Sequence, residues 1–222
     1  MPIGPSFSVA TLLEWTPESD PDARYSRASI PMANREGGFV VNPKANPEAK
    51  LMLCSLANSS HDTTSSQGTE NFMSWSFNYW QYTDSFVYWS GSEEGLICCP
   101  TGEFTDAAHT NGVPVVATLG FPWGSGSGYA EEVDAFCQKA EDGSFPVADK
   151  LLAVMDYYGF DGYFFNQESF GCSAEIASRL DEMIRYMRAK CPDILISWYD
   201  SMLPSGGVSY QNAVNSLSLI HI

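Results

Sequence analysis

Segments with the composition of buried β-strands alternate along this chain with segments whose apolar residues recur at helical spacing. Five strands are predicted, at residues 50–56, 84–89, 113–119, 160–168 and 193–199. Their apolar, β-branched and aromatic residues run almost unbroken, which is typical of strands covered on both faces. Strands that alternate with helices in this way predict parallel β/α units packed in layers.

The apolar periodicity predicts four helices, at residues 104–110, 133–140, 147–158 and 176–187. In the last two, apolar residues occupy positions i, i+4, i+7, i+8 and i+11, the spacing of a helix with one core-facing side. Asn111-Gly112, Gly159 and Pro192 follow three of these helices, and each is a frequent helix terminator.

No glycine-rich phosphate loop follows any predicted strand, which argues against a nucleotide-binding sheet and favours a (β/α)₈ barrel. Five units do not close an eight-unit barrel, and the missing strands would leave an open sheet edge. The expected fold is therefore α/β, an incomplete (β/α)₈ TIM barrel with about five of eight units present. On this interpretation the chain is truncated.

Three segments are expected along the chain. Residues 1–50 are rich in Pro, Ser and Asp and are predicted to be an irregular N-terminal segment of the catalytic domain, wrapped on its surface. Residues 51–216 are predicted to form the partial barrel. Residues 217–222 resemble the translation of a sequencing adapter and are predicted to be a non-native tail, with an ordinary short strand as the alternative.

The strand predicted at 160–168 ends with an amide and a carboxylate, Asn166 and Glu168. Side chains alternate across a strand, so these two are expected to point the same way. A carboxylic acid, kept neutral by aromatic surroundings, can protonate a leaving oxygen, and an amide can hold and polarise a neighbouring group. This pair suits the cleavage of a sugar whose own 2-acetamido group makes the nucleophilic attack.

The ends of other predicted strands carry aromatic residues, and the chemistry of such barrels lies at the carboxyl ends of their strands. Trp89, Phe121 and Trp123 are predicted to bind substrate, because flat rings stack on pyranose faces. Tyr199 could donate its hydroxyl to the acetamido oxygen. The alternative for all of these aromatic side chains is core packing.

Three polar residues near these motifs are expected to be structural. Asp161 lies roughly 20–23 Å from Glu168 along an extended strand, too far for a pair of catalytic carboxylates, which need about 5–10 Å. Gln167 is predicted to point into the packing layer on the opposite face from its neighbours. His109, in a predicted helix, is expected to be structural or solvent-facing.

Composition excludes several classes of function. With 27 acidic and 11 basic residues the net charge is −16, which disfavours nucleic acids and anionic membranes as partners. The six cysteines include no Cys-x-x-Cys pair and the three histidines are scattered, so neither a metal nor another cofactor is expected. Free, mostly buried thiols are predicted. Oligomeric state is left open.

No apolar run approaches the length of a membrane span, and the N-terminus lacks the basic start and apolar stretch of a signal peptide. A cytoplasmic protein is the expectation from the visible sequence. Secretion is the alternative if Met1 is not the native start.

Four segments of the chain, 78–90, 105–115, 157–168 and 198–202, resemble glycoside hydrolase family 85 in order and spacing. The most specific is Tyr157-Tyr-Gly-Phe-Asp-Gly-Tyr-Phe-Phe-Asn-Gln-Glu168. The resemblance implies a (β/α)₈ catalytic barrel that cuts the bond between the two core N-acetylglucosamines of N-linked glycans with retention of configuration. Many members also transfer the glycan to an acceptor. The family's later strands have no counterpart in this chain.

Carried over by motif, the resemblance implies that Glu168 is the acid/base, that Asn166 positions the acetamido group and that Tyr199 assists it. Trp89 and the loop of Phe121 and Trp123 would line the site. The implied substrate is an N-linked glycan or glycoprotein. Two alternatives remain open: a non-catalytic carbohydrate-binding homologue, and a chitinase-like glycosidase, which would favour an Asp at position 166.

Overall fold

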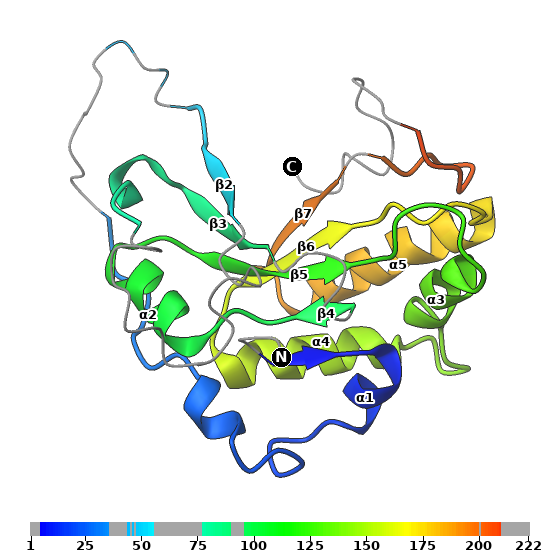
Figure 1. The fold of residues 1–222 in the computed structure, drawn as a ribbon, viewed down its shortest axis with the longest axis horizontal. Coiled ribbons are helices and arrows are strands. Elements are labelled where there is room, and N and C mark those ends of the chain that lie inside the picture. Colours follow the sequence, from blue (N-terminus) through cyan, green and yellow to red (C-terminus); the bar gives the residue numbers. More distant parts are fainter. Residues whose placement is uncertain are drawn as a thin grey trace.

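The computed structural model describes residues 5–35, 44, 46, 48–55, 77–89, 96–199 and 201–209. These residues form an α/β structure around a mixed, seven-stranded sheet (Figure 1). Five of its strands run parallel and are neighbours in chain order, as the sequence predicted. They are β2 (Met52–Ser55), β3 (Ser85–Tyr88), β5 (Val115–Gly120), β6 (Gly162–Asn166) and β7 (Leu195–Trp198).

Two further strands are antiparallel and were not predicted. Strand β4 (Ile97–Cys98) pairs with β5, and β1 (Ser6–Phe7) pairs with β4. Each has only two residues, too few for a period-two pattern to be visible in the sequence.

The four predicted helices are present as α2 (Gly102–Thr110), α3 (Tyr129–Phe136), α4 (Pro146–Tyr158) and α5 (Ala174–Lys190). The ends of α2, α4 and α5 follow signals in the sequence, whereas α3 lies four residues before its predicted bounds of 133–140. Helix α4 ends at Gly159, whose φ of 81° is in the left-handed region that glycine tolerates. Helix α5 begins after Ser173, whose hydroxyl accepts from the amide of Ile176, and it ends before Pro192.

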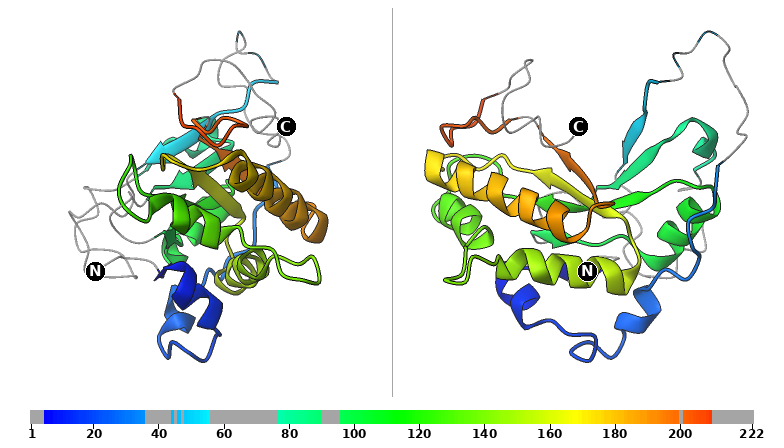
Figure 2. Two further views of the ribbon diagram at one scale, coloured as in Figure 1. Left: turned by 90° about the vertical axis from the view of Figure 1, so that its right-hand side faces the viewer. Right: turned by 180° about the vertical axis from the view of Figure 1, so that it is seen from behind.

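The sheet has two distinct faces. Alternate residues of β5, β6 and β7 pack with α3, α4 and α5 in the main hydrophobic core, and Phe86 and Tyr88 of β3 pack under α2. We call this side the helix face, and Figure 2 shows α4 and α5 lying along it. The residues between them point to the other side, here called the inner face, where Val87, Val116 and Phe164 form a smaller cluster.

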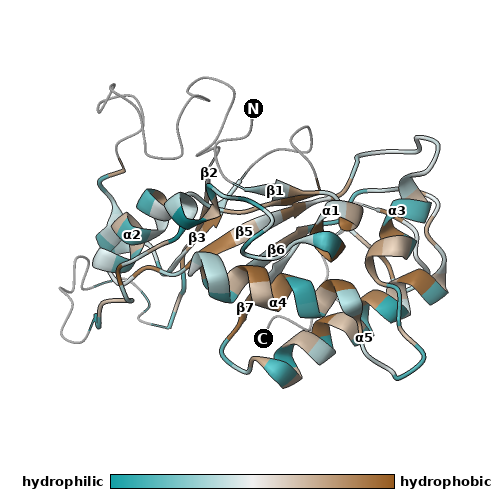
Figure 3. Ribbon diagram, turned by 90° about the horizontal axis from the view of Figure 1, so that it is seen from below, coloured by the Kyte–Doolittle hydropathy of each residue, from teal (hydrophilic) through white to brown (hydrophobic). Residues whose placement is uncertain are grey.

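The hydropathy of the strands and helices agrees with a hydrophobic core between the sheet and the helices. In Figure 3, β3 and β5 are largely hydrophobic, while α4 and α5 carry both hydrophilic and hydrophobic segments, as expected of helices with one buried side. None of the helices in the described ranges combines the length and apolar character needed to cross a bilayer.

The expectation of an irregular N-terminal segment is wrong for residues 6–14. They form β1 and a helix, α1 (Val9–Glu14), which begins with a capping box between Ser8 and Thr11. Leu12 and Trp15 are buried in the main core, where α1 packs against α4. Six residues make fewer than two turns, too few to show a periodic apolar pattern, so this helix depends on tertiary packing as well as on its capping box.

Residues 27–35 run along the amino-terminal end of the sheet and are held there by hydrogen bonds. The carboxylate of Asp106 accepts from the amides of Ser29 and Ile30, and the amide of Ala28 donates to Tyr158. The Arg35 guanidinium donates to the carbonyl of Thr83. This end of the sheet lies opposite the end that carries Asn166.

Candidate active site

Strand β6 delivers Asn166 and Glu168 to the same side of the sheet. Phe165 packs in the main core, whereas Phe164 belongs to the inner-face cluster, so the alternation places Asn166 on the inner face. The Asn166 Nδ2 donates to the Glu168 Oε2 at 3.0 Å. Asn166 is only 4% exposed and Glu168 is partly exposed. The amide and the carboxyl group therefore lie side by side at the carboxyl end of the strand, as predicted.

The neighbouring strand β5 has a glycine beside Asn166. Gly120 of β5 is in register with Asn166 and adds no side chain to the inner face. The amide of Phe121 donates to the carbonyl of Asn166 at 3.1 Å. Strand β5 therefore fixes the Asn166 backbone and places no side chain beside Asn166 at this register position.

The loop after β5 is joined to the loop after β6. The amide of Gly124 donates to the carbonyl of Glu168 at 3.1 Å, and the amide of Phe170 donates to the carbonyl of Gly124 at 2.7 Å. The Ser169 hydroxyl donates to the carbonyl of Pro122 at 2.7 Å. These bonds give Glu168 a rigid backbone although it lies outside any strand.

Trp89 and Tyr199 lie on the inner face, on the same side as Asn166. Both are partly buried against the cluster of Val87, Val116 and Phe164. The Trp89 ring meets Phe164 edge-on, with centroids 5.8 Å apart. The structure thus brings Trp89 and Tyr199 to the side of the sheet that carries the Asn166–Glu168 pair.

The prediction for Phe121 is wrong. Its side chain has no exposed surface and packs on the helix face against Phe136 of α3, with ring centroids 5.0 Å apart. It continues the alternation of β5 by one residue, which turns it away from the inner face. It therefore belongs to the core and does not line the site.

Trp123 lies on the surface and has an aromatic neighbour that the sequence did not suggest. Trp123 is 63% exposed and Phe170 is 41% exposed. Their rings meet at a steep angle with centroids 6.4 Å apart. The pair is carried by the two loops whose backbones are joined at Gly124, Glu168 and Phe170. Exposure of a large ring is not visible in a sequence, so Phe170 could not have been found there.

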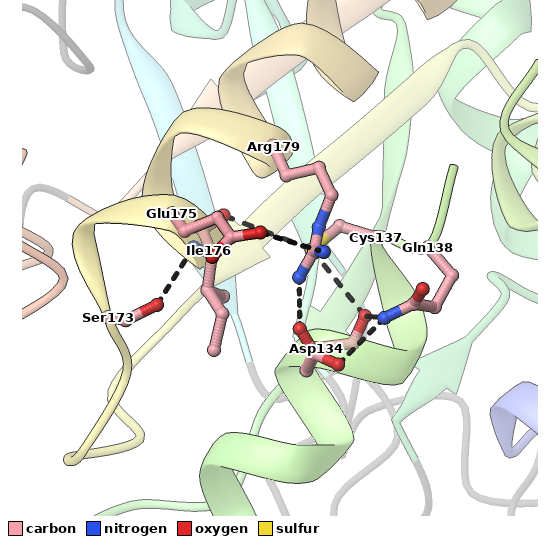
Figure 4. Close-up of polar contacts among 7 residues, drawn as sticks. All are labelled: Asp134, Cys137, Gln138, Ser173, Glu175, Ile176 and Arg179. Carbon is pink, nitrogen blue, oxygen red and sulfur yellow. Dashed lines mark hydrogen bonds and ion pairs between the residues drawn. The ribbon is translucent and has the colours of Figure 1, made fainter. Parts of the chain in front are cut away.

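Behind the site, helices α3 and α5 are joined by a polar contact (Figure 4). Arg179 of α5 forms an ion pair with Asp134 of α3 and approaches Glu175 at 3.9 Å. The Cys137 thiol lies in this joint, and burial raises its pKa. A thiol kept neutral in this way is a poor nucleophile. All six cysteines are free, and four are buried, as predicted.

Asp161 and His109 lie at the opposite end of the sheet, and both are structural. The His109 Nε2 donates to the Asp161 carboxylate at 2.9 Å, and its Nδ1 donates to the carbonyl of Ile30 at 2.8 Å. Asp161 also accepts from the amide of Val115. Burial disfavours the imidazolium, but the bonds to Asp161 and Ile30 outweigh it and raise the His109 pKa above its ordinary value. The two residues tie the N-terminal segment to β5 and β6.

Within the described ranges no group of three His, Cys, Asp or Glu residues is arranged to hold a metal ion. The predicted tail at 217–222 lies outside the described residues.

Comparisons with known proteins relate this chain to a family of glycoside hydrolases. The family model described as glycosyl hydrolase family 85 matches residues 57–220. The cytosolic endo-beta-N-acetylglucosaminidase of Gallus gallus is 31% identical over 215 residues, covering 92% of this chain and 27% of that protein. The cytosolic endo-beta-N-acetylglucosaminidase of Homo sapiens is 28% identical over 213 residues, covering 94% of this chain and 27% of that protein.

Among solved structures, the glycoside hydrolase domain of Endo-D from Streptococcus pneumoniae R6 superposes with a TM-score of 0.85 at 36% identity, covering 96% of this chain and 34% of that chain. The fold is thus that of a glycoside hydrolase domain. The chain belongs to glycosyl hydrolase family 85. It spans between 27% and 34% of the length of these three relatives.

Proposed function

We propose that the protein is an endo-β-N-acetylglucosaminidase that hydrolyses the GlcNAc-β1,4-GlcNAc core of N-linked glycans. The reaction would retain configuration and use the substrate's own acetamido group as nucleophile. The observation that carries this proposal is the 3.0 Å contact between the Asn166 Nδ2 and the Glu168 Oε2 on the inner face of β6. Relatives named as enzymes of this kind support it.

In the first step the carboxyl group of Glu168 protonates the glycosidic oxygen. The bond from this oxygen to the anomeric carbon breaks, and the acetamido oxygen bonds to that carbon to form an oxazoline that keeps the acetamido N–H and therefore carries a positive charge. In the second step the Glu168 carboxylate takes a proton from water. The water oxygen attacks the anomeric carbon and reopens the oxazoline, so two displacements restore the original configuration.

Asn166 would hold the acetamido group during the attack. Its Nδ2 is engaged by Glu168, which leaves Oδ1 as the atom that meets the acetamido N–H. An acceptor there stabilises the positive charge that develops on the nitrogen. The Tyr199 hydroxyl would orient the acetamido oxygen from the neighbouring strand.

The aromatic residues would bind the sugar rings. Trp89, beside Phe164, would form part of the wall of the inner face. Trp123 and Phe170 would form an exposed stacking surface on the rim, beside Glu168. Phe121 takes no part, because its side chain is in the core.

We also propose that the sheet is part of a (β/α)₈ barrel. The parallel strands follow chain order without reversal, and helices α2 to α5 pack on one face only. This is the arrangement of consecutive barrel units, in which the other face lines the interior. The antiparallel strands β1 and β4 would be additions to it.

A cytosolic location is proposed from the names of the relatives. The chemistry described uses only protein side chains and the substrate's acetamido group, so no metal or cofactor is proposed. The partner is an N-linked glycan or glycoprotein.

The test is to incubate the full chain with a high-mannose glycopeptide and to follow the peptide mass, with Glu168→Gln as the control. The proposal predicts that the wild type leaves one N-acetylglucosamine on the peptide and that the variant leaves the glycan intact. Binding without any loss of glycan would instead indicate a non-catalytic carbohydrate-binding protein.

A further inference from the structure

We infer that Gln167 is a positioning residue, whose buried amide group fixes the backbone that carries Glu168. The inference rests on the proposed role of Glu168 as acid/base, and it adds a residue that itself faces away from the substrate. Gln167 and Ser169 have no exposed surface. They flank Glu168 on both sides.

The Gln167 amide closes a ring around Glu168. Its Oε1 accepts from the amide of Ser169 at 3.2 Å, and its Nε2 donates to the carbonyl of Ser169 at 3.1 Å. One side chain therefore holds both backbone groups of the residue that follows Glu168. The Nε2 also donates to the Cys172 thiol at 3.6 Å, and that thiol contacts the Ser169 carbonyl.

The orientation of this amide follows from its partners. Exchanging its oxygen and nitrogen would place a donor against the Ser169 N–H and an acceptor against the Ser169 carbonyl. Both contacts would then be repulsive. A carboxylate or an aliphatic side chain of the same length cannot make both bonds, so the position requires the primary amide.

The ring is anchored on two sides. The Ser169 hydroxyl donates to Pro122 in the loop after β5, and the Ser201 hydroxyl donates to the carbonyl of Gln167 from the segment after β7. The backbone of residues 167–169 is thus held between neighbouring strand ends. Because Glu168 lies between two fixed residues, its carboxyl group is aimed at Asn166 without needing contacts of its own to the core.

Removing the amide would leave the Ser169 N–H and carbonyl buried without this partner, a state that folded proteins avoid. The loop would relax to reach other partners, and Glu168 would move with it. A displacement of about 1 Å at a reacting group is enough to lower a rate by about 100-fold. The Glu168 side chain would remain present but would no longer be aimed at the glycosidic oxygen.

The first test measures the ring directly and needs no activity. Amide hydrogen exchange is followed by NMR in the full chain for the wild type and for the Gln167→Met variant. The matched control is Gln138→Met, which replaces an exposed glutamine just after α3. We expect Ser169 to exchange at least about tenfold faster in Gln167→Met only, with Val116 unchanged. Unchanged Ser169 exchange would overturn the inference.

The second test measures the consequence with the glycopeptide substrate. We expect Gln167→Met to lower kcat by about 10- to 100-fold with KM within about threefold, and to move the pH profile of kcat, because the acid/base is displaced. A general loss of stability would leave that profile unmoved in the folded fraction. Normal kcat and profile would refute the positioning role and leave the proposed function intact.

A third variant keeps the inference testable if the Gln167→Met protein does not fold. Gln167→Glu keeps the length and one acceptor but loses the donor to the Ser169 carbonyl, and it should show faster Ser169 exchange and reduced kcat of intermediate size. Wild-type exchange and kcat in this variant would overturn the inference. An inactive wild type would refute the proposed function, while Ser169 exchange would still decide whether the ring exists.

Discussion

Phe121 and Trp123 are two positions apart in one loop, yet Phe121 has no exposed surface and Trp123 is 63% exposed. Phe121 still follows the alternation of β5 and packs against Phe136 on the helix face. Trp123 follows Pro122, where the loop has left the sheet. Phe121 is therefore part of the core, whereas Trp123 is exposed and, under the proposed function, free to bind substrate.

This difference predicts opposite phenotypes. Phe121→Ala should lower the free energy of unfolding by about 3–5 kcal/mol, because it leaves a cavity between the sheet and α3. Trp123→Ala should leave the unfolding free energy nearly unchanged and raise KM for the glycopeptide about two- to tenfold, the worth of one aromatic contact. Denaturant titration and steady-state kinetics measure both. Equal effects of the two variants on stability would contradict the assignment.

The architecture could be predicted well from sequence because its signals are local. All five parallel strands and helices α2, α3, α4 and α5 follow apolar patterns, and glycine or proline residues mark several ends. The sequence did not predict three short elements, β1, β4 and α1, which have between two and six residues. Their conformation depends on contacts with β5 and α4 that are distant in the sequence, and no local pattern encodes such contacts.

The His109 environment predicts a pH dependence of stability. The raised pKa means that the folded state holds its proton more tightly than the unfolded state, whose value is near 6.5. This contribution is complete below pH 6.5 and is lost as the pH rises through the folded pKa. Asp161 and Asp106 are the acidic groups that raise this pKa.

The wild-type melting temperature should therefore fall as the pH increases above about 6.5. The His109→Gln variant has no imidazole to titrate. Its melting temperature should therefore fall less than that of the wild type over the same pH range. Thermal unfolding at a series of pH values measures it. A wild-type profile that is parallel to that of the variant would show that folding does not raise the His109 pKa.

Gly162 is predicted to tolerate no side chain. A Cβ atom at this position would lie 1.8 Å from the backbone oxygen of Leu195 in β7, so β6 and β7 would have to separate. Gly162→Ala should lower the unfolding free energy by about 1–3 kcal/mol or more. Gly207→Ala is the control, because its nearest contact would be an ordinary 3.6 Å to the Ser205 hydroxyl. A Gly162→Ala variant as stable as the control would mean that the strands are less closely packed.

Asn166→Ala separates the two halves of the proposed reaction. The variant should hydrolyse the glycopeptide about 100-fold more slowly or worse, because the acetamido group is no longer held for attack. A preformed glycan oxazoline should still be transferred slowly to an acceptor, since that step begins after the attack. Mass spectrometry of both reactions checks this, and unaltered hydrolysis would remove Asn166 from the mechanism.

The candidate site was predictable where alternation along one strand sufficed, as for Asn166 and Glu168. Alternation also places Phe121 with Leu119 on the helix face, and the prediction that Phe121 binds substrate did not apply it. The position of Trp123 was not predictable in this way, because the chain has left the sheet before it. Gln167 was expected in the packing layer, and its complete burial confirms this. Its double bond to Ser169 could not be foreseen, because it depends on the course of the loop.

The central claim is that the substrate supplies the attacking atom, with Glu168 as proton donor and Asn166 as a neutral clamp. It is tested most directly by comparing two glycopeptides that differ only at carbon 2 of the cleaved sugar, one with the acetamido group and one with a hydroxyl. The account predicts release of glycan from the first and no turnover of the second. A retained rate on the hydroxyl compound would mean that the protein supplies its own nucleophile, contrary to this mechanism.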